Sequence, residues 1–347
     1  MNTTIGVGIL GAGPVVQAIH LPTLARLTDL FSVRTIMDVN AEVAAEVAGR
    51  VGALPVTSLD ALLDDASVEV VAICSPQQFH AGQVIAAMRA GKKAVLCEKP
   101  LAVSREEAEQ IAAISAQTGV PLIVGAMHTF DPAWLQALPF IDELRSEAHT
   151  IRSSIVLPFN DRFEDWATEV VTRPDFAFPD EMNAALRAQM MPLAVLGLAI
   201  HDLPLVRSFL PQGDALITSA EFIPPFGYAI TLSVGETVAD ISGLMQPHWQ
   251  PQWQFEAVSD KAHLHVDFTP SFVHAGSAVA TYTDEQGTRV FGNAGHNGYE
   301  GEWRAVAAAA RGDQTLVPPL EDLINDLVLA VDVAETSAAL QLKETVH

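Results

Sequence analysis

The sequence predicts an α/β protein of two domains, the first built on a parallel sheet and the second an α+β domain with a large, mainly antiparallel sheet. With 347 residues, the chain exceeds about 250 residues, the size at which single hydrophobic cores usually stop growing. Up to residue 127, short β-branched segments alternate with alanine-rich segments, as parallel strands and crossover helices do. Later strand-like segments are longer and follow one another with few helices between them. The predicted domains are therefore residues 1–127 and 128–347.

Strands and helices are expected to alternate throughout the first domain. The predicted strands are Ile5–Leu10, Val33–Asp38, Val68–Cys74, Lys93–Cys97 and Pro121–Val124. The predicted helices between them are Ala41–Val51, Ser58–Asp64, Ala81–Ala90 and Arg105–Gln117. Ser104 is followed three residues later by Glu107, a capping-box spacing that marks the start of the last helix.

The second domain is expected to contain one sheet, one internal helix and two closing helices. Its predicted strands are Thr150–Leu157, Ala215–Phe222, Tyr228–Val234, Thr237–Met245, Gln252–Val258, His263–Phe268 and Ala278–Tyr282. Its predicted helices are Ala184–Leu210, Glu302–Arg311 and Leu320–Leu340, the last after the turn Pro318-Pro319.

Composition and charge exclude several classes of protein. Hydrophobic residues make up 49% of the chain, which is enough for folded cores and argues against disorder. The formal charge of −23 repels phosphate backbones and anionic lipids, so neither nucleic acid nor a membrane surface is an expected partner. Cys74 and Cys97 stand in apolar segments, which favours buried reduced thiols. No Lys or Arg precedes Arg26, and no uninterrupted apolar run approaches about 20 residues, so we expect a cytoplasmic protein.

Two glycines stand where the first strand turns into a helix. Gly11-Ala12-Gly13 directly follows Ile5–Leu10 and precedes a helical stretch over Val15–Leu24. At such a turn Gly11 permits the tight bend, and Gly13 lets the backbone approach a pyrophosphate. The pattern predicts a dinucleotide site of the Rossmann type.

The start of the following helix completes this predicted site. Its first residues, Pro14 and Val15, are expected to bind the cofactor at a helix N-terminus, where backbone N–H groups attract phosphate. The third position of the glycine fingerprint is Val16, which is expected to loosen the packing of helix on strand without abolishing binding.

Asp38 ends the second predicted strand, where a carboxylate accepts hydrogen bonds from the adenosine ribose and repels a 2′-phosphate. Val39-Asn40-Ala41 supplies no arginine for such a phosphate. The expected cofactor is therefore NAD, with NADP disfavoured. The histidines show no spacing typical of a metal site, so no metal is expected.

Further motifs resemble those of the Gfo/Idh/MocA oxidoreductase family. The segment Ile73-Cys74-Ser75-Pro76-Gln77 with His80 is followed by Val95–Pro100, which contains Glu98-Lys99-Pro100 after the fourth strand. Additional agreement comes from His20-Leu21-Pro22, from Gly125 through Phe130-Asp131-Pro132, from His201-Asp202-Leu203 and from Pro318–Asp322. The resemblance spans most of the chain.

The resemblance implies a site at the carboxyl edge of the parallel sheet. Lys99 would be catalytic, stabilising charge on the substrate oxygen beside the nicotinamide. Pro100 would stiffen the turn, with a cis peptide bond as one way to do so. Contacts with the cofactor are expected from Ser75, Gln77, His80 and Glu98.

His201 is the second residue to which the resemblance assigns a catalytic role, as proton acceptor. Many family members carry an aspartate one helical turn earlier, where this chain has Gly197. Because residues four apart share a helix face, we expect position 197 to lie beside His201. His128 replaces a position that is often basic in the family and is left outside the catalytic set. Tryptophans and histidines of the second half are expected to be core or interface residues more often than a sugar-stacking wall: His248, Trp249, Trp253, His296 and Trp303.

The predicted function is NAD-dependent hydride transfer to or from a secondary alcohol of a sugar, glycoside or cyclitol. Two alternatives stay open: reduction of a non-sugar carbonyl or unsaturated ring, and a dinucleotide-binding regulator without turnover, which Gly197 favours and Lys99 opposes. The expected assembly is a homodimer or homotetramer through the C-terminal sheet.

Overall fold

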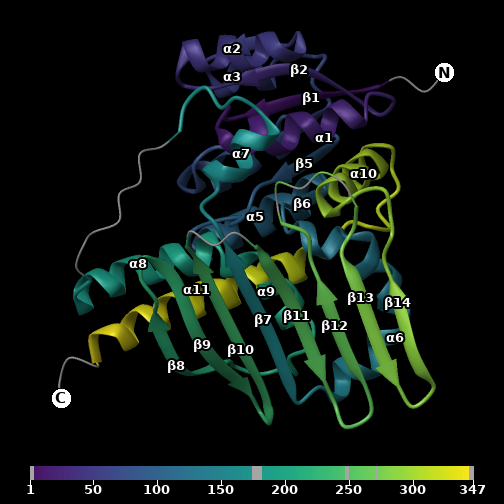
Figure 1. The fold of residues 1–347 in the computed structure, drawn as a ribbon. Coiled ribbons are helices and arrows are strands. Elements are labelled where there is room, and N and C mark those ends of the chain that lie inside the picture. The colour runs from purple at the N-terminus through teal and green to yellow at the C-terminus, as the bar shows by residue number, and fades with distance from the viewer. Residues whose placement is uncertain are drawn as a thin grey trace. The chain divides into compact units, whose positions relative to one another are not determined.

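The computed structural model describes residues 4–173, 182–246, 250–270, 272, 274 and 276–343 (Figure 1). The described residues form two compact units. The first contains residues 4–125, 163–173 and 299–327, and the second contains 126–162, the described residues from 182 to 298, and 328–343. The chain thus returns twice to the first unit. The domains predicted from the sequence were two continuous segments, 1–127 and 128–347, and that domain division stays a prediction.

The first unit is built on a six-stranded sheet in the order β3-β2-β1-β4-β5-β6. All neighbouring strands are parallel, as predicted. Strands β1, β4 and β5 are buried along their whole length, which explains why they read as continuous apolar segments. The strands are β1 (Ile5–Leu10), β2 (Phe31–Met37), β3 (Leu54–Val56), β4 (Val70–Ile73), β5 (Ala94–Cys97) and β6 (Leu122–Val124). The sequence analysis missed β3, a three-residue edge strand with two exposed side chains.

The helices of this unit begin and end at residues that the sequence marks. The Ser104 hydroxyl accepts a hydrogen bond from the Glu107 N–H, so the predicted cap is confirmed, and Gly119 ends the same helix in a left-handed conformation. The helices are η1 (Val16–His20), α1 (Leu21–Arg26), α2 (Ala41–Val51), α3 (Leu59–Leu63), η2 (Gln77–Phe79), α4 (His80–Arg89) and α5 (Arg105–Thr118), together with most of α7 (Asp161–Ala167) and α10 (Gly298–Ala310).

The second unit is built on an eight-stranded sheet in the order β14-β13-β12-β11-β7-β10-β9-β8. Only β10 and β7 are parallel, so the prediction of a mainly antiparallel sheet is confirmed. The strands are β7 (Thr150–Leu157), β8 (Leu216–Phe222), β9 (Phe226–Val234), β10 (Thr237–Met245), β11 (Gln252–Val258), β12 (His263–Asp267), β13 (Val279–Asp284) and β14 (Gly287–Phe291). The analysis missed β14, whose side chains are largely exposed and carry little hydrophobic pattern.

Helices contact this sheet through α6, α8 and α9. Buried and less buried residues alternate along β7 and β10, as expected of a sheet with one covered face. The helical elements are η3 (Met127–Phe130), α6 (Pro132–Glu147), α8 (Ala184–Gly197), η4 (Ala199–His201), α9 (Leu203–Arg207) and α11 (Leu320–Lys343), the last shared with the first unit. The analysis missed α6, although Asp131 caps it by accepting from the Ala133 N–H.

The prediction of one continuous helix over Ala184–Leu210 is wrong. Helix α8 ends at Gly197, Leu198 is its C-cap, and two short helices follow. Pro204 lies in the first turn of α9, where a proline is tolerated because that N–H has no intrahelical partner.

The apolar segment 184–201 is long and apolar enough, by length and composition alone, to cross a membrane. The segment contains Arg187 and Gln189, so it is not an uninterrupted apolar run. In the fold the segment comprises two helices, α8 and η4, and α8 packs against β8 and β9, which accounts for its apolar composition.

Candidate functional site

The turn after β1 has the geometry that its two glycines predicted. Gly11 adopts a φ of +89°, and a side chain there would overlap the backbone of Cys74 and Ser75 at 2.7–2.9 Å. A Cβ at Gly13 would meet no atom within 4 Å, so the backbone there is open to a ligand. Pro14 and Val15, both half-buried, form the first helical turn. These residues fit a pyrophosphate at a helix N-terminus.

The helix that follows is locally a π-helix from Val16 to His20. Val16 is fully buried at the position where the glycine fingerprint has its third small residue. A π-turn is wider than an α-turn, and such turns are rare outside functional sites. The looser packing expected at Val16 stays a prediction.

Asp38, the residue expected to bind the adenosine ribose, also stabilises this turn. Its Oδ2 accepts from the Ala12 N–H at 2.9 Å, and its Oδ1 accepts from the Asn40 N–H at 2.9 Å. Asn40 in turn caps α2 through hydrogen bonds from Glu42 and Val43. The carboxylate predicted to select NAD is thus held rigidly beside the glycine turn.

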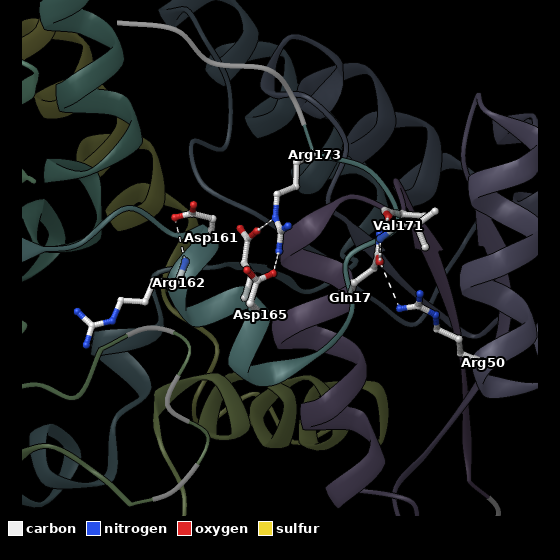
Figure 2. Close-up of polar contacts among 9 residues, drawn as sticks. Gln17, Arg50, Asp161, Arg162, Asp165, Val171 and Arg173 are labelled. Carbon is white, nitrogen blue, oxygen red and sulfur yellow. Dashed lines mark hydrogen bonds and ion pairs between the residues drawn. The ribbon is translucent and has the colours of Figure 1, made fainter. Parts of the chain in front are cut away.

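A segment far along the chain closes on the same turn (Figure 2). The Gln17 side chain donates to the Ala12 carbonyl at 2.8 Å and accepts from the Val171 N–H at 3.0 Å. Arg50, near the end of α2, donates to Gln17 Oε1 at 3.3 Å and to the Glu169 carbonyl at 2.8 Å. Gln17 therefore links the glycine turn to residues 169–171. The sequence analysis did not identify this role.

The segment is also tied to its own helix. Arg173 donates to Glu164 Oε2 at 2.7 Å and pairs with Asp165, both on α7 (Figure 2). These bonds fold residues 168–173 back onto α7 and fix the backbone that Gln17 and Arg50 contact.

The carboxyl edge of β4 and β5 carries the motif residues singled out in the sequence. His80 bridges two turns, because its Nδ1 lies 2.6 Å from the Pro100 carbonyl and its Nε2 lies 2.8 Å from the Ser75 carbonyl. The Lys99-Pro100 peptide bond is cis, as the resemblance suggested. Ser75 donates to Gln83 at 2.6 Å, and Gln77 begins η2. Both ring nitrogens of His80 thus bind backbone carbonyls of this edge.

Glu98 belongs to a buried chain of three side chains. Its Oε1 lies 2.9 Å from His20 Nε2, and His20 Nδ1 accepts from the Trp303 indole N–H at 3.1 Å. Burial alone would raise the pKa of Glu98, but the hydrogen bond and charge of His20, with Lys99 nearby, outweigh it and lower that pKa. Glu98 is therefore a buried carboxylate at neutral pH, and we call this chain the His20 triad.

Lys99 follows directly and is half-buried. Burial lowers its pKa below the ordinary lysine value, and the negative charge of Glu98 opposes that effect. A lysine tuned in this way at a sheet edge is typical of a functional group.

Glu302 is a second buried carboxyl group near Glu98. Both of its oxygens lack a hydrogen-bond partner among the described residues. Burial raises the pKa of Glu302 strongly, and repulsion by Glu98 adds to the effect. Burial therefore favours the protonated form of this group. Sequence reasoning had no signal for it, because one glutamate on an amphipathic helix looks solvated.

The second unit contains a buried carboxylate with three donors. Asp202 accepts from Ser153 Oγ at 2.6 Å, from the Trp253 indole N–H at 2.8 Å and from His128 Nδ1 at 2.7 Å. Asp202 is 1% exposed and His128 is 3% exposed. The sequence analysis left His128 out of the catalytic set.

His201 lies beside this network and is almost buried. Its ring centre is 5.2 Å from that of Trp253 and 6.4 Å from that of His128, and its Nδ1 lies 3.2 Å from the Met127 sulfur. Gly197 does not share an α-helical face with His201, since α8 ends between them; a Cβ there would meet only Phe226, at 3.9 Å. The placement of position 197 beside His201 stays a prediction.

Two of the tryptophans lie in the core, as expected. Trp253 and Trp303 are buried in the cores of their units, and neither is exposed for stacking on a sugar. His248 and Trp249 lie outside the described residues. Within the described ranges, no group of three His, Cys, Asp or Glu side chains is placed to hold a metal.

The first unit matches a known protein family over most of its length. The family model of the Gfo/Idh/MocA proteins, described as an oxidoreductase family with an NAD-binding Rossmann fold, matches residues 5–126. Inositol 2-dehydrogenase 3 of Saccharopolyspora erythraea is 35% identical over 140 residues, which are 40% of this chain and 41% of that relative. The 4-carboxy-2-hydroxymuconate-6-semialdehyde dehydrogenase of a Sphingobium species is 38% identical over 128 residues, 37% of this chain and 40% of that relative. The chain thus matches about two fifths of the length of these curated relatives.

Solved structures extend the likeness over nearly the whole fold. UDP-N-acetylglucosamine 3-dehydrogenase GnnA from Acidithiobacillus ferrooxidans has a TM-score of 0.74 at 19% identity, covering 98% of this chain and 100% of that chain. KijD10, a 3-ketoreductase from Actinomadura kijaniata in complex with NADP and TDP-benzene, has a TM-score of 0.72 at 21% identity, covering 96% and 98%. Residues 5–126 thus match the NAD-binding region of the Gfo/Idh/MocA oxidoreductases, and the fold of nearly the whole chain is similar to these solved structures.

Proposed function

We propose that this protein is an NAD-dependent dehydrogenase of the Gfo/Idh/MocA family that oxidises a secondary alcohol of a sugar, glycoside or cyclitol, or catalyses the reverse reduction. The observation that carries the proposal is Lys99: it follows the buried Glu98 carboxylate at the edge of a Rossmann sheet, and its pKa is lowered. A bound nicotinamide supplies the carbon that accepts or gives the hydride.

Each predicted site residue has a proposed task. Lys99 donates a hydrogen bond to the substrate oxygen and stabilises its negative charge, and His201 accepts the hydroxyl proton. Glu98 opposes the effect of burial on the pKa of Lys99, so the ammonium form persists to higher pH. His80 holds the Ser75 and Pro100 backbone at this edge.

The cofactor is held by the edge of the first unit. We propose contacts from Gly11, Gly13, Pro14 and Val15 to the pyrophosphate, and from Asp38 to the adenosine ribose. The remaining proposed contacts come from Ser75, Gln77, His80 and Glu98. Asp38 favours NAD because a 2′-phosphate would approach a carboxylate that no nearby arginine offsets; KijD10, in contrast, was solved with NADP.

The substrate class is proposed from the relatives that share the NAD-binding region. Inositol 2-dehydrogenases recur among them, and a 3-reductase of a dTDP-linked sugar from Actinomadura kijaniata is 31% identical over 155 residues. A cyclitol or sugar ring is what these names have in common.

A substrate panel tests the proposal. Purified protein is given NAD or NADP with myo-inositol, simple glycosides and UDP-N-acetylglucosamine, and reduced nicotinamide is followed by absorbance. We expect turnover of at least one ring alcohol with NAD, lost in Lys99→Ala. If NADH binds but no ring alcohol or corresponding ketone reacts, the enzymatic proposal fails and the regulator alternative replaces it.

We propose a cytoplasmic homodimer or homotetramer that assembles through the C-terminal sheet. On strands β9 and β10 of this sheet, Asp240 is exposed and Thr231 and Ser242 are half-buried. Light scattering gives the oligomeric state, and charged substitutions at Thr231 or Ser242 should lower it.

A further inference from the structure

His128 has one ring nitrogen bound and one without a partner. Its Nδ1 lies 2.7 Å from Asp202 Oδ1, so the proton of the neutral ring is on Nδ1 and Nε2 carries a lone pair. Nε2 is buried and has no hydrogen-bond partner among the described residues. A buried polar atom without a partner is costly, about 1–3 kcal/mol, and it marks a place where a ligand or a proton completes the structure.

The surroundings of His128 hold the ring in a fixed orientation. Phe268 stacks on it with ring centres 3.8 Å apart, and Trp253 meets it edge-on at 4.5 Å. Asp202, which fixes Nδ1, is itself fixed by Ser153 and Trp253. An imidazole oriented by a buried carboxylate is well arranged to hold a second proton, because the carboxylate stabilises the imidazolium.

Two imidazoles therefore lie close together in this unit. The ring centres of His128 and His201 are 6.4 Å apart, and both rings contact Trp253. Rings whose centres are this far apart cannot hydrogen-bond each other directly, so a proton that passes between them needs one hydroxyl group or water in between.

We propose that His128 and Asp202 form a proton-holding pair that serves His201. The proposal rests on the proposed function, in which His201 takes the substrate's hydroxyl proton. The O–H bond breaks with its electron pair left on oxygen, the proton passes to His201, and a proton moves through one bridging hydroxyl or water to form an N–H bond at His128 Nε2. Asp202 balances the resulting positive charge, and the steps run backward during reduction.

The titratable groups around His128 are few. Asp202 and His201 lie beside it, and Asp131, which begins α6, interacts with it through charge. Burial raises the pKa of Asp131. Tyr228 is near Asp202, and burial raises its pKa well above the ordinary value, so it stays neutral.

The first test needs neither cofactor nor substrate. Long-range proton–nitrogen NMR of the full-length protein reports which imidazole nitrogens carry protons, and His128→Asn identifies the signal. We expect Nδ1 protonated and Nε2 bare at about pH 8, with both protonated in acid. A ring with its proton on Nε2 at that pH, or one that stays neutral to about pH 5, would overturn the proposal.

The second test uses kinetics. His128→Asn keeps a donor for Asp202 but removes the titrating nitrogen, so kcat should fall about 10–100-fold with little change in KM, and its pH dependence should flatten. His263→Asn is the matched control, since His263 lies on β12 and pairs with Glu256 at the surface. Unchanged turnover and pH profile in His128→Asn would sink the idea.

The two tests separate this proposal from the proposed function. If wild-type protein oxidises no alcohol, the dehydrogenase proposal fails, and the NMR result alone decides whether His128 holds a proton. If His128→Asn does not fold, His128→Gln replaces it in the kinetic test. Its amide group keeps a hydrogen-bonding group at the position of Nε2, and the same kinetic criteria apply.

Discussion

Each unit of this protein buries a tryptophan, a histidine and a carboxylate, but the three are joined differently. In the His20 triad, Trp303 donates to His20 Nδ1 and His20 Nε2 donates to Glu98, so both ring nitrogens are used. In the second unit, Trp253 and His128 both donate to Asp202, and His128 Nε2 is left over. The same residue types thus give a closed chain in one place and an open one in the other.

The difference separates a structural role from a chemical one. A histidine with both nitrogens bound can orient Glu98 but has no free lone pair to take a proton. A histidine with one bound nitrogen and one bare nitrogen is oriented and still basic. We therefore expect substitutions in the closed triad to change stability, and substitutions in the open pair to change the pH dependence of turnover.

The largest effect on activity is expected at Lys99, the neighbour of the closed triad. Lys99→Ala should lower turnover at least about 100-fold, because the ammonium acts mainly on charge that develops during the reaction. NADH affinity, measured by fluorescence, serves as the control and should change little. If Lys99→Ala is as active as the wild type, Lys99 is a structural residue and not a catalytic one.

Matched substitutions of His20 and His128 test whether the two histidines contribute differently to stability. His20→Asn removes the partner of a fully buried carboxylate, and losing one partner of a buried pair typically costs about 3–5 kcal/mol. His128→Asn keeps a donor to Asp202, so its cost should stay near about 1 kcal/mol. Chemical denaturation of both variants measures the difference. Equal losses would mean that the two histidines do not differ in role.

Asp38 should show an intermediate effect. Asp38→Ala removes the acceptor of the Ala12 and Asn40 N–H groups and the charge that repels a 2′-phosphate. We expect NAD affinity to fall about tenfold, which is about 1.4 kcal/mol, and the preference over NADP to shrink. Calorimetric titration with both cofactors provides the numbers. Tighter NADP than NAD binding by the wild type would refute the role given to Asp38.

Glu302 gives a smaller, pH-dependent effect. Because the folded-state pKa of Glu302 is raised, its contribution to stability is complete below the ordinary glutamate range and is lost as the pH rises toward the folded-state pKa. Glu302→Gln stays neutral, so it should be more stable than wild type by on the order of 1 kcal/mol at mildly alkaline pH and no more stable in acid. Thermal unfolding across that pH range tests this. A difference independent of pH would show that Glu302 is not protonated in the fold.

The smallest effect is expected at Gly197. A Cβ there makes only an ordinary contact with Phe226, at 3.9 Å, and alanine favours the end of α8 over glycine. Gly197→Ala should therefore change stability by less than about 1 kcal/mol and leave the pH–rate profile unaltered. A shifted pH–rate profile in Gly197→Ala would show that position 197 lies beside His201.

Local patterns in the sequence predicted those parts of the fold that short segments specify. Strands β1, β7, β10 and β11 begin and end at the predicted residues, because buried β-branched segments and turns define them. Weakly patterned elements were missed, namely the edge strands β3 and β14 and helix α6. The break at Leu198 was missed because periodicity over residues 184–210 does not reveal a change of helix type.

Residues close together in the chain were enough to predict four features of this protein. They are the glycine turn, the acidic residue after β2, the Glu98-Lys99-Pro100 edge and the two kinds of sheet. Tertiary structure alone decided which polar groups meet. His20 reaches Trp303 across 283 positions, His128 reaches Asp202 across 74, and Gln17 meets Val171 across 154. Whether a buried histidine ends with a free nitrogen depends on such long-range partners, because hydrogen bonds over these separations form only when the folded core brings their groups together.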